Sequence, residues 1–136
     1  MSQRLPDWSV RLQAVVAQRL TRAFAWGLHD CALYAADCVQ ACTGTDPAAD
    51  LRGRYSTERG AARLIRRAVG RGGLAALAAA RLGDEIPPTL AIRGDVGVAD
   101  RGDGQLALVV CNGAVWQAPG PDGIVIVQQA LRAWRV

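Results

Sequence analysis

The chain changes character at Ile86-Pro87-Pro88, and this change limits the folds open to it. Before it, apolar residues recur at helical spacing, as in the run from Trp8 to about Arg22. After it come short runs rich in β-branched residues, separated by turn sequences such as Asn112-Gly113. Helices followed by an antiparallel β-meander predict an α+β fold.

Length and composition fit a single domain. The chain has 136 residues, 51% of them hydrophobic, and a formal net charge of +4. We expect one domain over residues 1–136, mainly helical over 1–88 and mainly β over 89–136. No apolar run approaches the roughly 20 residues of a membrane span, and the N-terminus lacks a signal-peptide core, so membrane insertion is not expected. Four cysteines without a signal peptide predict free thiols.

Cap and turn residues give approximate bounds for the elements. Asp7 is the predicted N-cap of the first helix and Ser56 that of the third. Asp30 begins the second helix, which Gly44 ends. A fourth helix is expected within 72–83, and strands are expected at 95–99, 105–110, 114–118, 124–127 and in the terminal 133–136.

The Asp30-Cys31 pair is the first candidate for chemistry. With Asp30 as N-cap, Cys31 becomes the first residue of a helix, where backbone N–H groups and the helix dipole favour a thiolate. The negative charge of Asp30 acts in the opposite direction. The position therefore suits a nucleophile without requiring one.

A metal site is the second interpretation of the cysteines. Cys31, Cys38 and Cys42 share one helical stripe, but Cys31 and Cys42 lie roughly 16 Å apart along the axis. One ion cannot bind both, and no CxxC spacing is present. We therefore expect small buried side chains, with no metal and no cofactor.

Several segments resemble the NlpC family of papain-like cell-wall cysteine peptidases. They are FAWGLHDCALYAADCV, RGDVGVA, QLALVVCNGAVWQAPG and RAWRV. With TGTDPAADLRGRYST and GPDGIV, the likeness narrows to small phage and prophage proteins encoded among tail genes. It implies a papain-like arrangement, with a cysteine nucleophile at a helix start. It also implies a histidine base on the second strand and a polar residue on the next strand that orients the base.

The resemblance leaves one of these three roles unfilled. Cys31 matches the nucleophile and Gln117 the orienting residue, but Gln105 stands at the histidine position. An amide cannot take a proton from a thiol near neutral pH. His29, the only histidine, stays open as a substitute base, although a hydrogen-bonded loop or interface histidine is the favoured interpretation.

A cluster of arginines is the remaining candidate surface. The chain has no lysine, and Arg59, Arg63, Arg66 and Arg67 fall at i, i+4, i+7 and i+8 on one helix face. A solvated face is the simplest interpretation, and a docking face for an acidic protein is the alternative. Nucleic acid is not expected as a partner, because no aromatic residues interleave with the arginines.

Two functions follow from the resemblance. The favoured one is a structural component of a phage or prophage-derived tail, at the tail tip or hub, made in the host cytoplasm and located in the virion. Its degenerate peptidase domain would dock other tail proteins, with Trp8, Trp116 and Trp134 as candidate exposed aromatics. The alternative is a peptidoglycan cysteine peptidase or amidase with Cys31 as the nucleophile.

Overall fold

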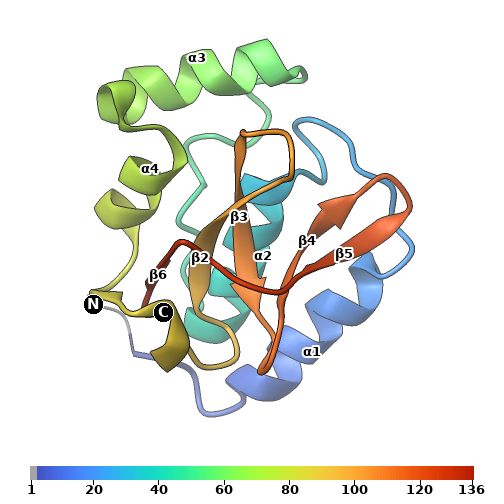
Figure 1. The fold of residues 1–136 in the computed structure, drawn as a ribbon. Coiled ribbons are helices and arrows are strands. Elements are labelled where there is room, and N and C mark those ends of the chain that lie inside the picture. The colour runs from blue at the N-terminus through green and yellow to red at the C-terminus, as the bar shows by residue number, and fades with distance from the viewer. Residues whose placement is uncertain (1–2) are drawn as a thin grey trace.

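The computed structural model describes residues 3–136 and has an α+β architecture (Figure 1). The prediction of this fold class is confirmed, with helices preceding most of an antiparallel sheet. The helical elements are α1 (Trp8–Arg19), α2 (Cys31–Thr43), α3 (Glu58–Val69), η1 (Gly70–Gly72), α4 (Gly73–Arg81) and η2 (Pro88–Leu90). The strands are β1 (Glu85–Ile86), β2 (Val96–Asp100), β3 (Leu106–Cys111), β4 (Trp116–Gly120), β5 (Gly123–Val127) and β6 (Arg132–Trp134).

The sheet has the order β1-β6-β2-β3-β4-β5, and every neighbouring pair is antiparallel. The expected meander covers β2 to β5, and its β3–β4 hairpin turns at Asn112-Gly113. The Asn112 N–H donates to Val115, and Gly113 has a φ of 81°, which suits a residue without Cβ. The last strand does not extend the meander but returns to pair with β2, and the short β1 was not predicted.

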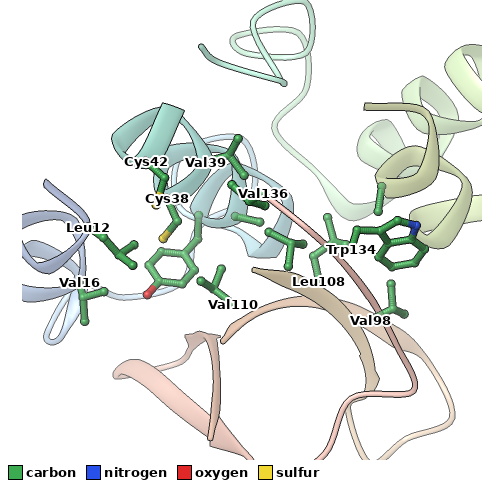
Figure 2. Close-up of a cluster of buried hydrophobic side chains, with 14 residues drawn as sticks. Leu12, Val16, Cys38, Val39, Cys42, Val98, Leu108, Val110, Trp134 and Val136 are labelled. Carbon is green, nitrogen blue, oxygen red and sulfur yellow. The ribbon is translucent and has the colours of Figure 1, made fainter. Parts of the chain in front are cut away.

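The main core lies between α2 and the sheet, with α1 packed alongside α2 (Figure 2). Cys38 and Cys42 are buried in it, so these two cysteines act as small apolar side chains. Such burial stabilises the fold by roughly 1.5–3 kcal/mol for each large aliphatic side chain. The other labelled members are Leu12, Val16, Val39, Val98, Leu108, Val110, Trp134 and Val136.

One predicted cap is wrong, and another is confirmed in its position only. Thr57 rather than Ser56 caps α3, since its hydroxyl accepts from the Gly60 N–H at 3.0 Å. Asp7 occupies the N-cap position of α1 as predicted, but its side chain makes no capping bond and pairs with Arg11 one turn later. In both cases a neighbouring polar side chain takes one side of the expected bond.

Two of the three tryptophans considered as candidate exposed aromatics are buried. Trp116 and Trp134 lie on opposite faces of the sheet, each in an apolar cluster. Trp8 is half-buried and stacks under the Arg4 guanidinium at 4.2 Å from the ring centroid. Exposed tryptophans therefore do not supply a docking surface.

A buried carboxylate joins the two ends of the described chain. Asp95 opens β2 and is 0% exposed, and it forms ion pairs with Arg4 at 3.0 Å and Arg135 at 2.8 Å. It also accepts from the backbone N–H groups of Ile92 and Val136. This group, called the Asp95 clamp below, satisfies both carboxylate oxygens with four donors.

Candidate functional site

The start of α2 is fixed by a fully bonded aspartate. Asp30 is 1% exposed, and its Oδ1 accepts from the Leu33 N–H at 2.9 Å, as predicted for an N-cap. Its Oδ2 accepts from the Gly27 N–H and from the Tyr55 hydroxyl. Gly27 has a φ of 81°, and a Cβ there would lie 2.2 Å from the Tyr55 carbonyl oxygen. Only glycine permits this close approach, which holds Tyr55 over the helix start.

Cys31 follows as the first residue of α2 and is half-buried. Burial, together with a smaller contribution from the negative charge of Asp30, raises the pKa of its thiol to about 11. A backbone hydrogen bond with Leu108 and the positive charge of Arg101 lower the pKa, but by less. The thiol is therefore protonated at neutral pH, unlike the thiolate that a cysteine nucleophile needs.

Gln105 lies near Cys31, at the mouth of the same cleft. It is exposed, just before β3, and its side-chain oxygen accepts from Arg101 at 3.1 Å. Its backbone N–H donates to Asp103. This residue is thus part of a surface turn that Arg101 and Asp103 hold together, and it offers the thiol no proton acceptor.

Gln117 lies apart from this cleft. It is buried in β4, opposite Val110 and Ile126, and it lines neither of the two clefts that Cys31 lines. Its side-chain oxygen has no hydrogen-bond partner within residues 3–136. The structure therefore brings Cys31 and Gln105 to one cleft and leaves Gln117 outside it.

His29 is buried and lines neither Cys31 cleft. Its ring meets Tyr34 edge-to-face at 5.9 Å, and neither ring nitrogen has a hydrogen-bond partner among the described residues. Burial lowers its pKa, as do the positive charges of Arg19 and Arg22. The prediction of a hydrogen-bonded loop histidine is therefore wrong for the ring, although the His29 backbone pairs with Ala25. No hydrogen bond joins His29 to Cys31.

The cleft above Cys31 has a volume of about 300 Å³. It is lined by residues of α3 and η1 and by residues of the turn before β3. Figure 1 shows α3 above the end of the sheet at which β3 begins. The surface of the cleft is mostly apolar, and three guanidinium groups and two carboxylates occur among the lining residues. They are Arg66, Arg71, Arg101, Glu58 and the fully bonded Asp30.

Three polar residues that line this cleft were not considered as site residues from the sequence: Tyr55, Glu58 and Arg101. Tyr55 lies in the segment TGTDPAADLRGRYST, on which the narrower resemblance rests. That segment could therefore have indicated Tyr55 as a site residue. For Arg101, nothing in the sequence indicated that the turn before β3 would meet the start of α2.

The cysteines do not form a metal centre in the part of the chain that the structure describes. No group of three or more metal-ligating side chains occurs within residues 3–136. All four cysteines are free thiols, and Cys31 alone among them is not fully buried.

Residues 3–136 match the family described as "Domain of unknown function (DUF6950)". The match spans nearly the whole sequence, so the chain belongs to this family. The chain has no significant match among curated proteins or among solved structures.

Proposed function

We propose that this member of the DUF6950 family is a phage-tail structural protein that uses a degenerate NlpC-like domain as a docking module. It would lie at the tip or hub of a phage or prophage-derived tail and bind other tail proteins. The proposal has two parts, a papain-like framework and the loss of its chemistry.

The arrangement of α2 on the sheet supports the framework. A helix that begins at Asp30-Cys31 packs on β3, and the Gly94-Asp95 pair opens β2 next to it. Both aspartates are buried and fully bonded. These are the segments on which the NlpC resemblance rests, and their side chains hold the elements that a papain-like domain needs.

The main support for a loss of peptidase activity is that the cysteine at the nucleophile position has no base. The thiol has a raised pKa, the exposed amide of Gln105 stands at the histidine position, and the only histidine is buried elsewhere. A fold that keeps its framework after its proton transfer is lost is best explained by a binding role.

The setting in a tail is supported by the resemblance to small proteins encoded among tail genes. No helix within residues 3–136 is long and apolar enough to span a membrane.

One observation favours a peptidase as the second candidate. Cys31 lies at a helix N-terminus in an open cleft, where backbone N–H groups can stabilise an oxyanion. Such an enzyme would cut peptidoglycan peptides, with a base supplied by a partner protein or by a rearranged His29.

Deletion of the coding gene from its phage or prophage tests the proposal. We expect particles with incomplete tails, and we expect both the wild-type gene and Cys31→Ala to restore complete, infectious particles. Complete tails without the gene, together with no association of the purified protein with tail proteins, would contradict the docking role. A folded Cys31→Ala protein that restores assembly but not infection would favour the peptidase.

A further inference from the structure

The positive charge of this protein is unevenly neutralised. All 16 basic residues are arginines, and eight of them form ion pairs within residues 3–136. The arginines of α3 and η1 are different, because all of them are exposed and none forms an ion pair among the described residues. They are Arg59, Arg63, Arg66, Arg67 and Arg71.

The structure divides these arginines between two faces. The cleft face of α3 presents Ala61, Ala62, Ile65 and Arg66, spaced as one helical stripe, and Arg71 joins them from η1. Arg59, Arg63 and Arg67 follow each other at i, i+4 and i+8 and do not line the cleft. Of the five arginines, Arg66 and Arg71 therefore line the cleft together with its apolar side chains.

The two ends of the cleft differ in charge. Glu58 and Arg101 line both this cleft and a neighbouring one, and Arg101 is already paired with Asp103. Arg66 and Arg71 line this cleft but not the neighbouring one, and neither forms an ion pair within residues 3–136. The cleft therefore has one neutralised end and one end with two uncompensated positive charges.

Apolar side chains lie between these ends. Ile65 and Leu74 are half-buried, and Leu106 is 43% exposed at the start of β3, beside Cys31. Exposed leucine next to free arginines is a favourable surface for a ligand that has both apolar and acidic groups.

We propose that this cleft binds an extended acidic peptide segment of a partner protein. Carboxylates of the segment pair with Arg66 and Arg71, and an apolar side chain packs on Leu106 above the Cys31 thiol. This inference rests on the proposed docking function and names the surface and the partner chemistry. Cys31, which is protonated, serves as part of the floor rather than as a reactive group.

Nucleic acid fits the cleft less well than a peptide. The carboxylate of Glu58 lies on its wall and would repel phosphates. The two aromatic residues that line the cleft are half-buried and already engaged, Trp26 edge-to-face with Phe24 and Tyr55 through its hydroxyl with Asp30. A phosphate backbone would bind Arg59, Arg63 and Arg67 as readily as the cleft arginines Arg66 and Arg71. A peptide and a nucleic acid therefore differ in which arginine substitutions should weaken their binding.

Direct binding is tested with a short synthetic peptide that alternates aspartate with leucine. Controls are the same peptide with asparagine in place of aspartate, and a single-stranded oligonucleotide. Arg66→Glu/Arg71→Glu is compared with Arg59→Glu/Arg63→Glu, which changes the net charge equally on the outer face of the same helix. Circular dichroism checks that both variants fold.

We expect the acidic peptide to bind and to slow the reaction of Cys31 with a maleimide, which reports occupancy of the cleft. The cleft variant weakens binding by roughly tenfold or more, and the outer-face variant by less than about twofold. Equal losses in the two variants, preference for the oligonucleotide, or unprotected Cys31 would overturn the inference.

Purified tails that lack the protein separate this inference from the proposed function. Uptake of the wild type but not of the cleft variant supports both. Equal uptake of the two overturns the cleft assignment and leaves docking in place. Uptake of neither, with peptide binding as expected, means that the tail role is wrong and the cleft assignment stands.

Discussion

The Asp95 clamp and the Cys31 cleft lie on the same sheet but differ in how completely their polar groups are bonded. Asp95 has four donors for its two oxygens, although it is buried. Cys31 has a protonated thiol, and Gln105 faces solvent. Gln117 is buried elsewhere, and its side-chain oxygen has no hydrogen-bond partner within residues 3–136. The framework residue Asp95 is thus held by several hydrogen bonds and ion pairs. The residues at the positions that match the NlpC catalytic residues form no hydrogen bonds with one another.

The difference shows that the bonding of the framework residues does not depend on the residues that line the Cys31 cleft, as the proposed function requires. A buried carboxylate without its partners destabilises the whole fold, so Asp95 and Asp30 cannot change freely. Gln105, in contrast, is exposed and its side chain accepts from Arg101, so a substitution there should change stability little. Substitutions at the two regions should therefore differ strongly in their effect on folding.

The largest effect is expected for Asp95→Ala. It leaves the guanidinium groups of Arg4 and Arg135 without their carboxylate and the N–H groups of Ile92 and Val136 without an acceptor. We expect a loss of about 3–5 kcal/mol in the free energy of unfolding, measured by urea denaturation at pH 7.

Asp122→Ala is the matched control for this change. Asp122 is exposed in the β4–β5 turn, so its removal should change stability by less than about 0.5 kcal/mol. Comparable losses in the two variants would mean that Asp95 does not act as a clamp.

An intermediate effect is expected for Asp30→Ala. This change removes the N-cap of α2 and the acceptor of Gly27 and Tyr55, and should cost about 2–3 kcal/mol. Tyr55→Phe removes one of these three bonds and should cost about 1 kcal/mol in the same urea titration. If Asp30→Ala were no worse than Tyr55→Phe, the helix start would not depend on its cap.

A smaller, pH-dependent effect is expected at His29. Its folded-state pKa lies below 6.5, so the unfolded chain binds the proton more readily and stability falls as the pH drops below about 6.5. The slope reaches at most about 1.4 kcal/mol per pH unit, and it should be visible in the denaturation midpoint between about pH 7.5 and 5.

His29→Phe provides the control for this slope. The uncharged ring should flatten the pH dependence in that window, because the carboxylates with lowered pKa values, such as Asp46, lose their contribution only at more acidic pH. An unchanged slope in His29→Phe would show that another group titrates there.

The sequence predicted the local features of this molecule better than the distant ones. Asp30 and Gly44 were identified because a cap bonds within its own helix end. The two-residue β1 was not, since it exists only through pairing with β6, about 50 residues later.

The same division holds for the candidate site. The position of Cys31 at a helix start follows from its neighbours. The burial of His29 and the meeting of Arg101 with Cys31 do not, because they depend on how α1, α3 and the turn before β3 pack together. The stripe of four arginines was recognised as one face, but only the packing of α3 separates Arg66 from the other three.

The pH dependence of Cys31 alkylation tests the central claim most directly, namely that the framework persists without the chemistry. The rate of reaction with iodoacetamide is measured by mass spectrometry on the full chain, in which the other three cysteines are buried, and the same protein is incubated with purified peptidoglycan. We predict an apparent thiol pKa of about 11 and no release of peptides. A thiol pKa below about 7, with cleavage that disappears in Cys31→Ala, would contradict the account.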